Sequence, residues 1–240
     1  MGENTNSKAF DYIKENLKII NENIAQASQV AGRDMNDIRL MAVTKNIEAE
    51  KINFVLDQGV SLIGENRVQE FVAKYDQIDF NKCKAHFIGH LQTNKVRQIV
   101  GRVDMIQSVD SLKIAKEIGK RSLNHSKNTK ILLEVNIGGE ASKFGFAPEE
   151  LIEKVYEISE IQGLEISGLM SLVPISENKK ELRKYFSDLN RLFIDISSKK
   201  IDNVSMEILS MGMSGDYYEA ILEGSNLIRV GSSIFAKREN

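Results

Sequence analysis

The sequence has a single cysteine, Cys83, among its 240 residues, so no disulfide can form within the chain. Its three histidines, His86, His90 and His125, show no metal-ligand spacing with this cysteine, and we predict no metal site. The first six residues are polar and do not resemble a signal peptide. A chain without disulfides or an export signal is expected in the reducing cytoplasm, with a structural or incidental role for Cys83.

Long apolar runs and an excess of one charge are also missing. No apolar segment approaches the roughly 20 residues that a membrane helix needs. The formal net charge is −2, with 32 basic and 34 acidic residues, which indicates neither a nucleic acid nor a membrane as partner. The remaining composition, 42% hydrophobic and 28% charged residues, is that of a globular protein with a substantial core.

Apolar strand-like runs alternate with helix-like runs along most of the chain. The strand-like runs are 39–45, 60–65, 85–91, 104–109, 130–137, 165–172, 206–212 and 227–231. The helix-like runs between them are 47–58, 67–78, 92–101, 111–127, 148–161, 177–199 and 215–223. The strands are continuously apolar, which is typical of parallel strands buried on both faces. Eight strands with helical runs between them predict an α/β fold, a TIM (β/α)8 barrel near its lower size limit.

An amphipathic helix precedes the first strand. Its apolar residues recur at helical spacing, at Phe10, Ile13, Leu17, Ile20 and Ile24. Only the short tail 234–240 follows the eighth strand, so we expect the N-terminal segment, residues 1–32, to pack on the barrel and help to cover that gap. No linker or repeat divides the chain, and we predict a single domain over residues 1–240. A doubly wound open sheet is the alternative, but no Gly-x-Gly-x-x-Gly turn follows the first strand.

Polar residues gather at the predicted carboxyl ends of the strands, where TIM barrels hold their active sites. Lys45 ends the first strand-like run. A lysine at the end of a buried strand meets low-dielectric surroundings, which favour a neutral, nucleophilic amine that can form a Schiff base with a carbonyl compound. In the alternative interpretation, the side chain extends from the strand end into water and has no chemical role.

The loops after the seventh and eighth strands often bind phosphate in this fold. Ser214 stands just before the predicted helix 215–223, where its hydroxyl and the free backbone N–H groups can hold an anion. Gly231 allows close approach of the backbone, and Ser232 adds a hydroxyl and an N–H group. An ordinary strand-to-helix turn with a capping serine remains the alternative to a phosphate site.

Arg229 belongs to the last strand. Alternation along a strand places Arg229 and Gly231 on one face of it, as it places Val43 and Lys45 on one face of the first strand. The first and last strands are neighbours in a closed barrel, so one lumen can hold the lysine, the arginine and the phosphate pocket. A buried arginine needs a partner, either in a structural salt bridge or at a ring nitrogen of a cofactor.

The strand-end segments resemble those of the pyridoxal phosphate homeostasis proteins, which are similar to the N-terminal barrel of alanine racemase. The resemblance is carried by Lys45 and the segments 64–70, 89–95, 211–216 and 229–235. The most specific are Gly-Glu-Asn-Arg-Val-Gln-Glu at 64–70 and Met-Gly-Met-Ser at 211–214. The segment after Lys45, Asn46-Ile47-Glu48, departs from the proline-containing segment that is usual in the family.

This resemblance implies pyridoxal 5′-phosphate (PLP) as the cofactor, bound as a Schiff base to Lys45. It implies that Asn66 lies near the ring, that Arg229 lies beside the pyridine nitrogen, and that His90 lies at the rim. It also implies a phosphate site formed by Ser214, Gly231 and Ser232, with Met213 beside it.

The resemblance further implies a protein of intracellular PLP homeostasis that stores, buffers or delivers the cofactor and so affects amino-acid and keto-acid pools. Apo PLP-dependent enzymes are the implied acceptors, and we expect a monomer without turnover. An arginine donor keeps the ring nitrogen unprotonated, which weakens the electron sink, and the chain ends where a racemase would continue into the domain that supplies its opposite-face tyrosine. The alternatives are a PLP-dependent amino acid racemase of low activity and a Schiff-base aldolase that binds a sugar phosphate without PLP.

Overall fold

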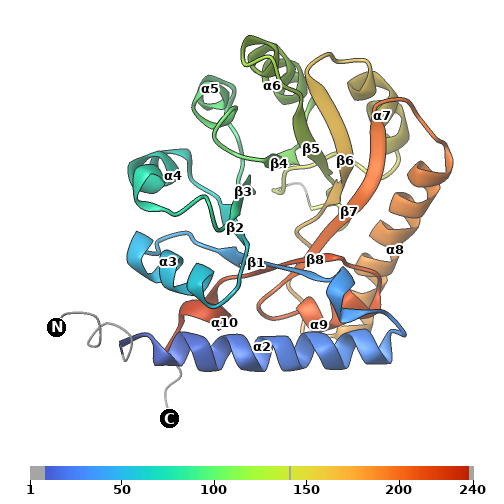
Figure 1. Cartoon of the computed structure of the whole chain (residues 1–240). Coiled ribbons are helices and arrows are strands. Elements are labelled where there is room, and N and C mark those ends of the chain that lie inside the picture. The colour runs from blue at the N-terminus through green and yellow to red at the C-terminus, as the bar shows by residue number, and fades with distance from the viewer. Residues whose placement is uncertain (1–8, 141, 238–240) are drawn as a thin grey trace.

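Eight parallel strands form a closed barrel in the computed structural model, which describes residues 9–140 and 142–237 (Figure 1). The strands are β1 (Arg39–Val43), β2 (Leu62–Glu65), β3 (Lys84–Phe87), β4 (Met105–Val109), β5 (Thr129–Glu134), β6 (Leu164–Met170), β7 (Val204–Met213) and β8 (Leu227–Val230). They follow one another around the barrel in chain order, and β8 pairs with β1. The predicted TIM barrel is confirmed. The polar N-terminal hexapeptide and residues 238–240 lie outside the described ranges.

Helices lie between successive strands, and a short one follows the last strand; together they surround the barrel (Figure 1). They are α3 (Ala49–Asp57), α4 (Val68–Lys74), α5 (Val96–Ile99), α6 (Leu112–Asn124), α7 (Leu151–Ser159), α8 (Lys179–Ser198), α9 (Tyr217–Leu222) and α10 (Ser232–Phe235), with short 3₁₀ turns η1 (Met35–Asp37), η2 (Tyr75–Gln77) and η3 (Thr93–Lys95). The predicted helix 92–101 is reduced to η3 and α5. Gly101, with a φ of 86°, takes the left-handed conformation that ends such a segment.

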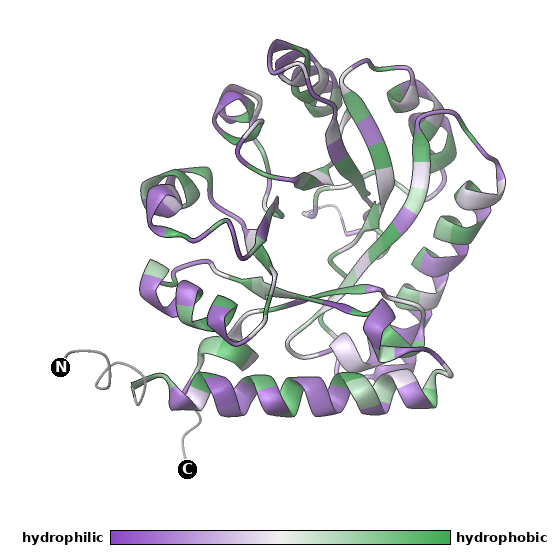
Figure 2. Ribbon diagram, in the orientation of Figure 1, coloured by the Kyte–Doolittle hydropathy of each residue, from purple (hydrophilic) through white to green (hydrophobic). Residues whose placement is uncertain are grey.

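Alternation along the strands separates two apolar regions. The inner face contributes a layer that fills the barrel lumen: Met41, Leu62, Met105, Leu132, Met170, Ile208 and Leu227. Most other buried apolar residues pack between the strands and the surrounding helices, where Cys83 also lies. Figure 2 shows the matching stripes of hydrophobic and hydrophilic residues on α2 and α8. The filled lumen leaves the carboxyl end of the barrel as the place for a ligand site.

Helix α2 (Asp11–Val30) lies along the outside of the barrel, beside α9 and α10 (Figure 1). Its apolar face packs with Ile221 of α9 and Ile228 of β8 in one buried cluster. The side-chain amide of the buried Asn16 donates two hydrogen bonds, each 3.0 Å long, to the carbonyl oxygens of Ile234 and Ala236. These two bonds join α2 to the short last helix. Within the described residues, no helix is long and apolar enough to cross a membrane.

We predict that Asn16→Ala lowers the free energy of unfolding by about 2 kcal/mol, because two hydrogen bonds are lost and two carbonyl groups lose their donor. The control is Asn21→Ala, an exposed position of the same helix, where the change should stay within about 0.5 kcal/mol. Both substitutions gain the same helix propensity, so their difference isolates the contact with α10. Chemical denaturation measures both. Equal values for the two variants would contradict the assigned role of Asn16.

Candidate functional site

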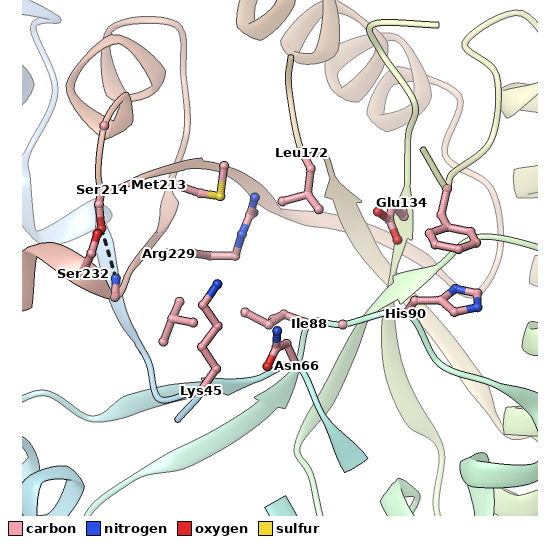
Figure 3. Close-up of a pocket in the computed structure, with 15 residues that line it drawn as sticks. Lys45, Asn66, Ile88, His90, Glu134, Leu172, Met213, Ser214, Arg229 and Ser232 are labelled. Carbon is pink, nitrogen blue, oxygen red and sulfur yellow. Dashed lines mark hydrogen bonds between the residues drawn. The ribbon is translucent and has the colours of Figure 1, made fainter. Parts of the chain in front are cut away.

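A cavity of about 500 Å³ opens at the carboxyl ends of the strands. Its size is typical of sites for small ligands. All seven residues that we predicted to bind the cofactor line this cavity, as does His90 (Figure 3): Lys45, Asn66, Met213, Ser214, Arg229, Gly231 and Ser232. Closure of the barrel thus brings together side chains from both ends of the chain.

Lys45 lies in a turn after β1 rather than in the strand. The strand ends at Val43, and the turn continues into Asn46, whose φ is 57°. The Lys45 side chain is exposed and extends into the cavity (Figure 3). The predicted low-dielectric surroundings are therefore wrong, because the turn carries this lysine past the packed strand end to the open mouth of the barrel.

Buried polar side chains hold the Lys45 turn from the side of α4. The ammonium of Lys74 donates to the carbonyl oxygen of Thr44 over 2.7 Å and forms ion pairs with Glu65, at 2.5 Å, and Glu70, at 2.9 Å. Glu70 also accepts a hydrogen bond from the backbone N–H of the residue after Lys45, over 2.5 Å. Two glutamates of the 64–70 motif therefore fix the turn that presents Lys45. The sequence indicated the motif, but Lys74 was missed.

A bulge in β7 sets the position of the phosphate-type loop. The register between β7 and β8 shifts between Ser210 and Met213, and Gly212 has a φ of 92°. The helix α9 consequently begins at Tyr217. The carboxylate of Asp216, the residue before it, accepts a hydrogen bond of 2.5 Å from the backbone N–H of Met213. The prediction that Ser214 directly precedes a helix and caps it is wrong, because this turn displaces the helix start.

The hydroxyl of Ser214 faces the next loop instead. It accepts a hydrogen bond from the backbone N–H of Gly231 at a distance of 3.2 Å (Figure 3) and another from the backbone N–H of Ser233 at 3.3 Å. A Cβ atom at Gly231 would lie 3.3 Å from the backbone oxygen of Val43, so glycine allows the loop to lie close to β1. The hydroxyl of Ser214 keeps its own hydrogen to donate, and together with the hydroxyl of Ser232 it gives this end of the cavity donors that are suited to an anion.

Arg229 is buried, with 3% of its surface exposed, and belongs to a hydrogen-bonded chain across the lumen. Its guanidinium donates to the hydroxyl of Ser210 over 2.6 Å and to the carbonyl oxygen of Ser171 over 2.8 Å. The Ser210 hydroxyl donates to the side-chain oxygen of Gln107 over 2.7 Å, and the amide nitrogen of Gln107 lies 2.8 Å from Nδ1 of His86. Among the described residues Arg229 has no ion pair, so a structural salt bridge is not its partner.

Burial sets the charges along this chain. It lowers the pKa of Arg229 to about 10, which still leaves the guanidinium cationic at neutral pH, while the charges of Asp216 and Glu134 act in the opposite direction. Burial also lowers the pKa of His86 to about 3, so this imidazole is neutral. Its Nδ1 can therefore accept a hydrogen bond from the Gln107 amide. The neutral partners orient the guanidinium without neutralising it.

Acidic and aromatic residues occupy the other end of the cavity. Glu134 ends β5, and burial together with the charge of Asp110 raises the pKa of its carboxyl to about 7, against the opposing effect of Arg229. Nδ1 of His90 lies 3.0 Å from the Asp110 carboxylate, and the imidazole stacks on Phe144 with 3.7 Å between ring centroids. Sequence reasoning missed both carboxylates, although each stands at a strand end.

Comparison with known proteins identifies relatives of this chain. The family described as "Alanine racemase, N-terminal domain" matches residues 16–239. The pyridoxal phosphate homeostasis protein of Aquifex aeolicus is 38% identical over 94% of this chain and 98% of its own length. That of Pseudomonas aeruginosa is 33% identical over 95% of this chain and 96% of its own length.

Solved structures give the same grouping. The structure of PipY from Synechococcus elongatus with PLP bound has a TM-score of 0.77 and 29% identity, covering 89% of this chain and 100% of that one. Alanine racemase from Clostridium difficile has a TM-score of 0.72 at 15% identity, which shows a common barrel fold; the match covers 96% of this chain and 58% of that one. The chain therefore belongs to the family of the pyridoxal phosphate homeostasis proteins, which share the alanine racemase N-terminal domain.

Proposed function

We propose that this protein binds PLP in the strand-end cavity, attached to Lys45, and keeps the cofactor available to other PLP-dependent enzymes. The observation that carries the proposal is one cavity that combines an accessible lysine, a pair of loops suited to an anion, and a buried cation. The homeostasis proteins and PLP-bound PipY support PLP as the ligand.

Each reactive part of PLP has a counterpart among the cavity residues. Ser214, Gly231 and Ser232 suit the phosphate, and Arg229 suits the electron pair of the pyridine nitrogen. Asn66 has a buried side-chain oxygen with no hydrogen-bond partner in the described structure, which is the kind of atom that a bound ligand satisfies. When bound, PLP supplies an aldehyde carbon that combines reversibly with amines, and Lys45 is the amine within reach.

The residues around the cavity favour holding PLP over turnover. Arg229 is cationic at neutral pH and can only donate, so a ring nitrogen beside it stays unprotonated and stabilises carbanion charge poorly. No tyrosine among the described residues lines the cavity. Tyr217, a nearby tyrosine, instead accepts a hydrogen bond from Asn23 of α2 over 2.9 Å and so points away from the cavity. These features support a carrier over a racemase.

We expect Lys45→Ala to abolish the visible absorption band of covalently held PLP and its trapping by borohydride, because no other lysine lines the cavity among the described residues. Lys143→Ala is the control, since this lysine belongs to a neighbouring loop outside the lining. It should keep both signals. Absorption spectra and mass spectrometry of the reduced proteins give the result. Undiminished trapping in Lys45→Ala would assign the attachment to another lysine, and a wild-type protein without any band would favour the aldolase.

The phosphate loops generate a second expectation. Ser232→Ala should weaken PLP binding by roughly tenfold, because a hydrogen bond to a charged group contributes about 1.5–3 kcal/mol and about 1.4 kcal/mol is a factor of ten. Binding of pyridoxal, which lacks the phosphate, should change little. Ser233→Ala keeps its backbone N–H and removes only a hydroxyl outside the lining, so it serves as the control. Titrations with both compounds measure the affinities, and an equal loss for PLP and pyridoxal would refute the assigned phosphate site.

Delivery without turnover is the third expectation. Loaded protein mixed with an unrelated PLP-requiring apo-enzyme should restore that enzyme's activity faster than PLP dissociates spontaneously. Deuterium from solvent should enter the α-position of added alanine slowly or not at all, because the weak electron sink disfavours loss of the proton. A parallel sample with a small-molecule scavenger of free PLP gives the rate of spontaneous dissociation. Transfer no faster than that rate would reduce the role to passive storage, and rapid exchange with inversion would support the racemase.

A further inference from the structure

The carboxylate of Glu134 has no partner within the described part of the chain. Only 6% of the residue is exposed, and no hydrogen bond or ion pair to its side chain is formed there. It nevertheless lines the cavity, and Figure 3 shows its carboxylate directed into the open space from the end of β5. Buried carboxylates are normally paired, so this one is suited to a donor that arrives with a ligand.

The charges around Glu134 indicate that the ligand group which pairs with its carboxylate is cationic. Asp110 places a second negative charge nearby; the guanidinium of Arg229 acts on Glu134 in the opposite direction, but it donates to Ser210 and Ser171 and forms no ion pair with this carboxylate. Burial and the charge of Asp110 raise the Glu134 pKa to about 7, because both disfavour the ionised form of a carboxyl group without a partner. A cationic group would relieve both the desolvation and the repulsion.

PLP does not supply such a group. Its phosphate belongs with Ser214 and Ser232, at the other end of the cavity, and it carries no ammonium group. The walls near Glu134 are apolar, formed by Ile88 and Leu172 and by the ring of Phe144. An acidic group among apolar walls fits a small molecule with an alkyl part and an ammonium group.

We propose that Glu134 binds the ammonium group of a second ligand, a small primary amine, in the same cavity as Lys45. The site deepens the proposed function, on which it rests for its biological meaning, because an amine bound there shares the cavity with the lysine that holds PLP. An ammonium group that gives its proton to the Glu134 carboxylate becomes a free primary amine, which can form a Schiff base with the aldehyde carbon while lysine leaves as its own free amine. Glu134 is then the residue that selects which molecules release the cofactor.

Propylammonium and its neutral analogue propanol are the probes for this site. Binding of each to the protein without PLP is measured by ligand-observed NMR at pH 8, where Glu134 is ionised. Propylammonium should bind at least tenfold more tightly to the wild type than to Glu134→Gln, and propanol should bind weakly and equally to both. Glu140→Gln, which removes a carboxylate from a nearby loop outside the lining, should match the wild type. Equal affinity of Glu134→Gln and the wild type for propylammonium would overturn the inference.

A measurement on the wild type covers the case in which Glu134→Gln does not fold. The titratable or charged groups that share the cavity or its wall with Glu134 are Lys45, His90, Asp110 and Arg229. Saturating propylammonium should lower the pKa of the Glu134 carboxyl, because a cation favours the ionised form. Carbon NMR of the labelled side chain measures this pKa. An unchanged pKa would contradict the site.

Titration of PLP into the same proteins separates this inference from the proposed function. Glu134→Gln should bind PLP within about threefold of the wild type, which is under 1 kcal/mol. A protein that binds propylammonium through Glu134 but takes up no PLP would refute the proposed function and support the amine site. If both proteins bind PLP and the wild type and Glu134→Gln have the same affinity for propylammonium, the amine site alone is refuted.

Discussion

Parallel pairing between β1 and β8 closes the barrel, and the cavity depends on this contact. In its register Met41 lies opposite Arg229, while Met213 of β7 pairs with the same arginine from the other side. The turn after β1 and the loop after β8 are therefore neighbours, and Lys45 and Gly231 share one cavity. An open sheet would leave these residues on opposite edges. Inward apolar residues fill the lumen beneath and leave only its carboxyl end open.

Burial of a charged arginine in that lumen is the second constraint. The chain from Arg229 through Ser210 and Gln107 to His86 supplies hydrogen bonds without a negative charge. A buried cation that is hydrogen-bonded only to neutral groups, with the charges of Asp216 and Glu134 acting on it without an ion pair, favours an electron-rich ligand above it. Under the proposed function, the lack of a direct carboxylate partner among the described residues would favour binding of PLP, because a salt bridge at this place would weaken the attraction for a ring nitrogen or a phosphate.

The barrel and the strand-end positions of Lys45, Arg229 and the phosphate loops could be predicted from strand periodicity and from the rule that parallel strands end at one rim. Asn66 and Met213, which also line the cavity, were expected only from the family resemblance. Local geometry was less predictable. The bulge at Gly212 displaces the helix that Ser214 was expected to cap, and a turn moves Lys45 beyond its strand. Glu134 was missed because periodicity shows that a residue is buried but not whether neighbouring strands supply a hydrogen-bond or ion-pair partner for its carboxylate.

Exposure of Lys45 bears on the choice between a carrier and an enzyme. Active sites that catalyse difficult proton removals generally exclude water and fix acid–base groups on both faces of the substrate. Here the lysine stands at an open cavity mouth, on a turn held rigidly by Lys74 and its acidic partners. If Lys45 holds the cofactor as proposed, an accessible attachment point lets solvent and competing amines reach that bond. Such a site is poorly suited to protecting a reactive carbanion and well suited to taking up and giving away an aldehyde.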